Sequence, residues 1–152
     1  MNKDALLLFE KEIKKVKIAS CLIYENGEIL FKYFKNKKME NKLFQLNSTT
    51  KSVISILIGI AIDKGLIKSV QTPIHEYFDI KDEDKRELTI EHLLTMTMGI
   101  EWGEFGPWGG RPFPMINSKD WIKFVLEKKM AKAPGAEMEY NSGASHLLSA
   151  IL

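Results

Sequence analysis

A serine and a lysine lie three positions apart at the start of a long apolar run. Ser48-Thr49-Thr50-Lys51 leads into residues 53–62, which are almost all aliphatic or small. In the first turn of a helix this spacing places both side chains on one face, in the field of the positive helix end. An amine beside a serine hydroxyl can make that hydroxyl nucleophilic without a histidine. The pattern also fits a purely structural role, with Ser48 as a helix N-cap and Lys51 as a solvated residue.

Composition defines the broad class of protein. The chain has 152 residues, enough for one domain with a real core. Its content of 45% hydrophobic and 28% charged residues is typical of soluble globular proteins. The formal net charge of +2 indicates neither a nucleic-acid nor a membrane partner, and the lysines of 32–42 fit a solvated loop. The N-terminus has only a short apolar stretch closed by charges, which cannot serve as a secretory signal, and no apolar run reaches the length of a membrane span. We therefore expect a cytoplasmic protein, unless an export signal has been removed.

The sequence offers little for metal or cofactor chemistry. Cys21 is the single cysteine, which excludes an internal disulfide framework, and its strand-like surroundings predict a small buried side chain. His75, His92 and His146 have no partner at a metal-ligand spacing, and we expect structural roles for them. We expect neither a metal nor a cofactor.

Hydrophobic periodicity predicts the elements that position these side chains. Two short strands over 17–24 and 28–34 are joined by Glu25-Asn26-Gly27, a strong hairpin signal. Helices are expected over about 4–16, over 49–64 with Gly65 as C-cap, over 89–96 with Thr89 as N-cap, over 118–129 with Ser118 as N-cap, and from 144 onward. Because only two strands are clear, we expect one α/β domain with an incomplete sheet and an open edge.

The segment 99–115 is rich in glycine, proline and aromatic residues, which predicts a loop packed by its own side chains. Trp102 and Trp108 are candidates for the rim of a substrate cleft, and packing in the loop or core explains them at least as well.

Several segments together resemble the serine β-lactamase and penicillin-binding-protein superfamily, in particular its class C-like hydrolase and esterase branch. Ser48-Thr49-Thr50-Lys51 is similar to the first family motif, and Tyr140-Asn141-Ser142, after a Pro-Gly turn, is similar to the second, Tyr-x-Asn. Residues 88–99 and 141–148 resemble segments common in that branch. The likeness spans about 17–152, in the family's order, and makes a cap-only role for Ser48 the weaker interpretation.

The resemblance implies an α/β (α+β) fold in which a helical region packs on an antiparallel sheet, with the active site between them. It implies that Ser48 attacks the carbonyl of an ester, amide or lactam and forms an acyl-enzyme, while Lys51 and Tyr140 act as general acid and base. The Ser48 backbone N–H would supply one oxyanion donor. A small-molecule substrate is therefore the expected partner.

Two departures from the family pattern qualify this expectation. Ser142 stands where the family pattern usually has an asparagine that helps to position the substrate, so we expect a shorter hydroxyl there that reaches the substrate through water. The third motif, Lys-Thr-Gly or His-x-Gly, does not occur in 1–152, so we expect this chain to be the N-terminal part of a single hydrolase domain that lacks its C-terminal strands. The alternative is an inactive fragment or a non-catalytic penicillin-binding-like module, completed by a second polypeptide or by a dimer through the open edge.

Overall fold

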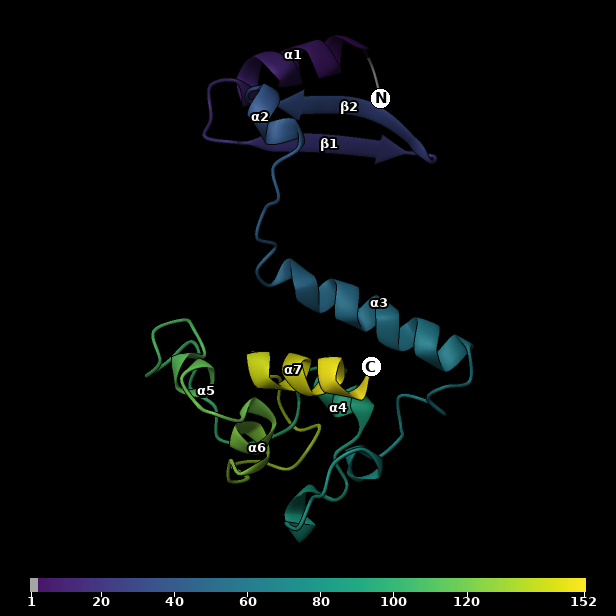
Figure 1. Ribbon diagram of the computed structural model, residues 1–152, viewed down its shortest axis with the longest axis vertical. Helices are drawn as coiled ribbons and strands as arrows, with labels where there is room; N and C mark the ends of the chain where they lie inside the picture. The colour runs from purple at the N-terminus through teal and green to yellow at the C-terminus, as the bar shows by residue number, and fades with distance from the viewer. Residues whose placement is uncertain (1–2) are drawn as a thin grey trace. The chain divides into compact units, whose positions relative to one another are not determined.

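The computed structural model describes residues 3–152 and divides the chain into two compact units, Met1–Gln45 and Leu46–Leu152 (Figure 1). The first unit holds the antiparallel hairpin, and the second is helical. Among the described residues, none of the helices combines the length and the apolar character that crossing a bilayer requires.

The first unit is built on the predicted hairpin. Strands β1 (Ser20–Glu25) and β2 (Glu28–Phe34) pair from Ser20↔Phe34 to Glu25↔Glu28, with a bulge between Ile23 and Tyr24. Asn26 and Gly27 both have positive φ, 52° and 84°, as the two central residues of a type I′ hairpin turn require. The predicted Asn-Gly turn is therefore confirmed, although β1 begins at Ser20 rather than Lys17.

Two short helices accompany the hairpin. Helix α1 (Lys3–Ile13) packs Phe9 edge-on against Phe31, with 5.3 Å between ring centroids. It ends before the predicted limit at residue 16, because the chain turns back through a bond from the Val16 N–H to the Ile13 carbonyl. Helix α2 (Lys37–Glu40) lies within the lysine-rich segment that was expected to be a loop. Cys21 is half-buried on β1, so the prediction of full burial was wrong.

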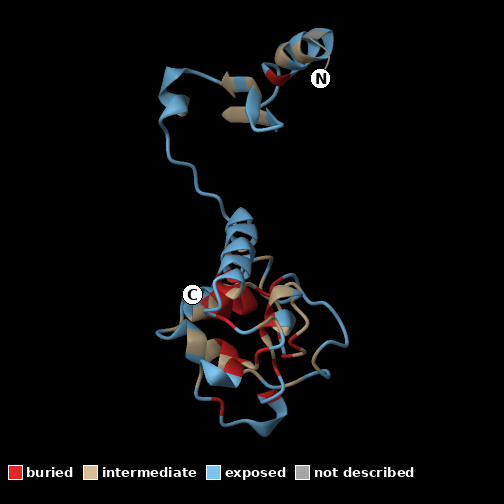
Figure 2. Ribbon diagram, turned by 90° about the vertical axis from the view of Figure 1, so that its right-hand side faces the viewer, coloured by how far each residue is buried: buried red, intermediate tan, exposed pale blue. Residues whose placement is uncertain are grey.

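The second unit packs its helices around α7 (Ser142–Ile151). This helix contacts α3 (Thr49–Asp63), α4 (Ile90–Leu94) and α6 (Trp121–Leu126), and Figure 2 shows the buried residues gathered where these elements meet. The remaining elements are the short helices η1 (Ile74–Glu76), η2 (Glu83–Lys85) and α5 (Phe113–Ile116). Helix α7 is therefore the central helix of this unit.

Helix α3 follows its sequence prediction closely. It ends at Asp63, with Lys64 as C-cap, and Gly65 then adopts φ 70°, the left-handed conformation that glycine accepts without steric cost. Ile58 and Ala61 of this helix enter the core, whereas an apolar row over 53–60 remains exposed; its members are Val53, Ile56, Leu57 and Ile60.

Helix α6 differs from its prediction at both ends. Its N-cap is Asp120, whose carboxylate accepts the Lys123 N–H at 2.9 Å, and not Ser118, whose hydroxyl donates to the Met115 carbonyl. The helix stops at Leu126 because the following residues pair with the 99–101 segment instead. Met130 forms a β-bridge with Ile100, and Glu101 donates its N–H to the Lys129 carbonyl.

Candidate functional site

The start of α3 presents Ser48 without using its hydroxyl as a cap. Asn47 adopts φ 49°, a left-handed conformation that asparagine tolerates, and Ser48 follows with helical angles. The first amides of the helix bond to backbone carbonyls, Thr50 N–H to Asn47 and Lys51 N–H to Ser48. Ser48 occupies the N-cap position of α3, as the structural interpretation expects, but its side chain makes no capping bond, so capping does not account for its hydroxyl.

The Ser48 hydroxyl is bonded to two side chains that can carry protons. The Tyr140 phenol donates to Ser48 Oγ at 2.7 Å, and Lys51 Nζ donates to the same oxygen at 3.2 Å. Lys51 Nζ also lies 5.0 Å from the centroid of the Tyr140 ring. Three of the predicted site residues therefore meet at one point in the Leu46–Leu152 unit.

Within the Leu46–Leu152 unit the three residues differ in exposure. Ser48 is exposed, whereas Lys51 and Tyr140 are half-buried. The arrangement is chemically suited to moving a proton to and from the Ser48 oxygen.

Tyr140 is placed by the start of α7. Asn141, only 3% exposed, is the N-cap of this helix, and its Oδ1 accepts the Ala144 N–H at 3.0 Å. On the other side, Glu139 donates its N–H to the Met96 carbonyl at 2.9 Å. The backbone that carries Tyr140 is thus fixed before and after the residue.

Ser142 is engaged by a buried carboxylate that the sequence analysis missed. Its hydroxyl and its N–H donate to the two oxygens of Glu104, at 2.6 and 2.8 Å, and the Trp102 indole N–H donates to Glu104 at 3.0 Å. Glu104 is 4% exposed. In the sequence Glu104 is only an acidic residue in an aromatic loop, because its partner Ser142 lies 38 positions away.

The two tryptophans of the 99–115 segment pack together. Trp102 is buried and meets Trp108 edge-on, with 4.7 Å between ring centroids, and both approach Phe124. Packing in the loop and core, one of the two expectations for these residues, is what the structure shows. Their contribution to a substrate cleft, like that of Ser142, stays a prediction.

Each of the three histidines makes a contact that can account for it as a structural residue. His75 Nδ1 lies 3.0 Å from the Arg86 carbonyl, and His92 Nδ1 accepts the Thr89 N–H in a capping box that confirms Thr89 as the N-cap of α4. His146 packs against Trp121 of α6. Burial lowers the pKa of His146 below its ordinary value, and nearby Asp120 opposes that shift only in part.

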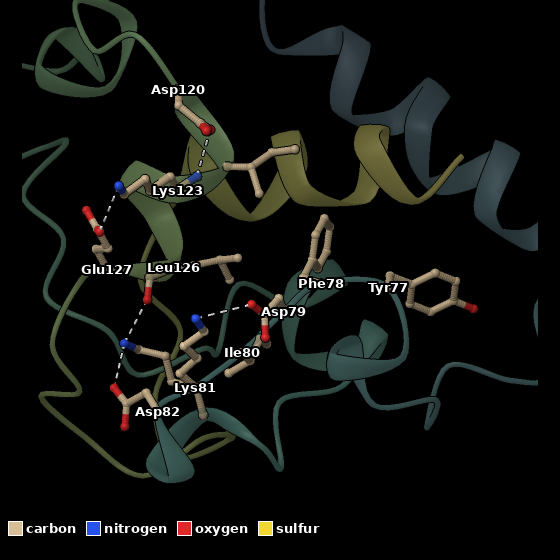
Figure 3. Close-up of a pocket in the computed structure, with 12 residues that line it drawn as sticks. Tyr77, Phe78, Asp79, Ile80, Lys81, Asp82, Asp120, Lys123, Leu126 and Glu127 are labelled. Atoms are coloured by element: carbon tan, nitrogen blue, oxygen red, sulfur yellow. Dashed lines mark hydrogen bonds and ion pairs between the residues drawn. The ribbon is translucent and has the colours of Figure 1, made fainter.

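A separate cavity of about 700 Å³ lies between the 77–85 segment and α6 (Figure 3). Its charged groups are paired within the protein: Lys85, whose side chain is 3% exposed, bonds to Asp82 at 2.7 Å and to the Leu126 carbonyl at 2.8 Å. The hydrogen bond from Lys85 holds the pKa of Asp82 below its ordinary value. Ser48, Lys51 and Tyr140 do not line this cavity, so it is distinct from the candidate site.

Comparison with known proteins identifies the family. The family model described as Beta-lactamase matches residues 9–152, and the chain therefore belongs to the β-lactamase family. This confirms the resemblance drawn from the Ser48 and Tyr140 motifs.

A solved structure shows the same fold. A putative 6-aminohexanoate-dimer hydrolase from Bacillus anthracis superposes with a TM-score of 0.68 at 18% identity, over 93% of this chain and 41% of that one. An uncharacterized protein of Alkalihalophilus pseudofirmus is 37% identical over 62 residues, which are 41% of this chain and 18% of that protein. The chain thus matches less than half the length of either protein. The expected mixed fold, with helices and an incomplete antiparallel sheet, is confirmed.

Proposed function

We propose that this chain carries the acylation site of a serine hydrolase that cleaves an ester, amide or lactam. The observation that supports the proposal is the pair of hydrogen bonds on Ser48 Oγ, from Tyr140 at 2.7 Å and from Lys51 at 3.2 Å. Membership of the β-lactamase family agrees with hydrolase chemistry of this type. The substrate would be a small molecule with an activated or strained carbonyl.

In the proposed reaction Ser48 Oγ forms a bond to the substrate carbonyl carbon while its proton passes to Lys51 or Tyr140. Both residues donate to Ser48 in the observed arrangement, so one of them must first release its own proton to act as the base. The bond from the carbonyl carbon to the leaving oxygen or nitrogen then breaks, and the leaving atom receives the proton. Water repeats the sequence on the acyl-enzyme and restores the Ser48 hydroxyl.

The negative charge on the carbonyl oxygen would be stabilised near the start of α3. The Ser48 backbone N–H precedes this helix of 15 residues, whose positive end favours an anion. A second donor would come from a strand bearing Lys-Thr-Gly or His-x-Gly in the family pattern, and neither sequence occurs in residues 1–152. Loss of one oxyanion donor lowers the rate by about 10²–10³.

The sheet of the described residues has two strands, and this favours a second candidate, a non-catalytic penicillin-binding-like module that a second polypeptide or a second copy completes. The two candidates differ in the reactivity of Ser48 in the isolated chain. We would expose the purified chain to an alkyl fluorophosphonate and measure its intact mass. Ser48→Ala tests the site, and Ser52→Ala, an exposed serine one turn along the same helix, is the matched control.

A single adduct that disappears in Ser48→Ala and persists in Ser52→Ala supports the hydrolase. An adduct of equal yield in Ser48→Ala contradicts the assignment of the nucleophile. A chain that is folded by circular dichroism and forms no adduct favours the non-catalytic module.

A further inference from the structure

We propose that Glu104 and Phe105 act together as positioning residues that hold the Tyr140 phenol against Ser48. The inference rests on the proposed function in one respect only, namely that Tyr140 carries a proton of the reaction. The two residues are neighbours in the 99–115 loop, yet each reaches a different part of the Tyr140 region.

Glu104 holds the backbone just after Tyr140. Its buried carboxylate accepts both the N–H and the hydroxyl of Ser142, the first residue of α7, and a carboxylate at the start of a helix also gains from the positive helix end. The Trp102 indole N–H donates to the same carboxylate at 3.0 Å. A charged group with three donors in the protein interior is strongly fixed, so it fixes Ser142 in turn.

Phe105 holds the side chain of Tyr140. Its ring centroid lies 4.9 Å from that of Tyr140 with an interplanar angle of 57°, although Phe105 is 72% exposed. Among the described residues, the only ring that it contacts is Tyr140. The loop folds back beside Phe105, because the Gly110 N–H donates to the Glu104 carbonyl and a Cβ at Gly110 would lie 3.7 Å from the Phe105 ring.

Both contacts are needed because the phenol has to be aligned to within a fraction of an ångström. The bond from Glu104 fixes where the backbone lies, and the contact with Phe105 restricts the rotation of the ring. A displacement of about 1 Å at a proton-transfer group can lower a rate by about 10². The hydrogen bonds to Ser48 Oγ come from Tyr140 and Lys51, so Glu104 and Phe105 act through Tyr140.

The proposal is tested by the signal of the Tyr140 phenol. The chain is labelled with tyrosine carrying ¹³C at Cζ, and the Tyr140 resonance is assigned with Tyr140→Phe among the four tyrosines. Ser48→Ala removes the hydrogen-bond acceptor of the phenol and should shift this resonance. We expect the shift caused by Ser48→Ala to fall by about half or more in the Glu104→Ala and Phe105→Ala backgrounds.

Conservative and control variants separate positioning from a general loss of structure. In Glu104→Gln the amide oxygen can still accept the Trp102 and Ser142 N–H groups, and the amide NH₂ can donate to the Ser142 hydroxyl. We therefore expect Ser48→Ala to shift the Tyr140 resonance in this variant as much as it does in wild type. Glu101→Ala and Phe113→Ala change exposed residues of the same segment and should also keep the full shift. If Glu104→Ala fails to fold, Phe105→Ala decides alone, because its side chain is outside the core.

The joint role is overturned if Ser48→Ala shifts the Tyr140 resonance as much in either folded variant as it does in wild type. It is also overturned if Ser48→Ala does not shift the Tyr140 resonance in the wild-type background. The rate of fluorophosphonate labelling gives the second measurement, with an expected loss of about tenfold or more in Glu104→Ala and recovery in Glu104→Gln. A wild-type chain that is never labelled refutes the hydrolase, while the resonance still tests the positioning. If the chain is labelled by fluorophosphonate but the Tyr140 resonance does not change with Ser48→Ala, the positioning role is refuted and the hydrolase proposal is retained.

Discussion

The Tyr140 phenol donates a hydrogen bond of 2.7 Å to the Ser48 hydroxyl, although 92 positions separate the two residues. Ser48 precedes α3 and Tyr140 lies two residues before α7, so the contact joins the N-terminal ends of two helices that pack on each other. The consequences of this arrangement can be measured directly.

Tyr140→Phe removes the shorter of the two bonds to Ser48 Oγ and keeps the ring that Phe105 contacts. Since a positioned acid or base contributes about 10²–10⁴ in rate, we expect the rate of Ser48 labelling to fall by at least about 10². Tyr77→Phe, a partly exposed tyrosine that lines the separate cavity, is the control. Equal labelling rates for wild type and Tyr140→Phe would remove the phenol from the mechanism.

Lys51→Met keeps most of the side-chain length and removes the amine that donates to Ser48 at 3.2 Å. We expect a loss of labelling rate of about 10² or more, with an unchanged melting temperature because Lys51 is only half-buried. Lys64→Met, an exposed lysine at the other end of α3, should label at the wild-type rate. If both variants react alike, the amine has no part in activating the serine.

Gly143→Ala tests the packing at the start of α7. A Cβ at this position would lie 2.6 Å from Val125 Cγ2 and 2.8 Å from Trp102 Cη2, both in the core. We expect the free energy of unfolding to fall by about 1–3 kcal/mol, measured by urea denaturation. Gly59→Ala in helix α3 is the matched control, because a Cβ at this position would meet no atom within 4 Å. Since alanine favours a helix more than glycine does, this variant should raise the free energy of unfolding by about 0.5–1 kcal/mol. Two variants of equal stability would contradict this packing.

His146 predicts a pH dependence of stability. Burial lowers its pKa from the ordinary 6.5, so the unfolded chain takes up a proton at a higher pH than the folded one. The stability due to the neutral imidazole is fully present above pH 6.5 and is lost as the pH falls from 6.5 toward the folded pKa. Melting temperatures between about pH 5 and 7.5 should fall less steeply in His146→Gln than in wild type. His75→Gln controls for the loss of an exposed histidine, and identical slopes for wild type and His146→Gln would contradict the burial effect.

The parts of the fold that the sequence predicted depend on local interactions. The hairpin turn follows from Asn26 and Gly27, which accept positive φ, and the end of α3 follows from Gly65 for the same reason. The spacing of Ser48 and Lys51 within one helical turn is also local, and their contact was expected from it. These features need no knowledge of the rest of the chain.

The parts that were missed depend on partners far away in the sequence. Helix α6 stops early because Met130 pairs with Ile100, and no pattern within 118–129 records that pairing. Glu104 matters because Ser142 reaches it from 38 positions away. The approach of Tyr140 to Ser48 was expected from the family resemblance and not from spacing, and the roles of these residues in catalysis stay predictions.

The three tryptophans of the chain, Trp102, Trp108 and Trp121, all belong to the Leu46–Leu152 unit, whereas the Met1–Gln45 unit has none. Tryptophan emission therefore reports on the helical unit alone, while the hairpin unit contributes only to far-ultraviolet dichroism and tyrosine absorbance. Denaturation curves from the two signals will coincide if the units unfold as one cooperative domain and will separate if they do not. The uneven placement of one kind of side chain thus makes the cooperativity of this chain visible without a label.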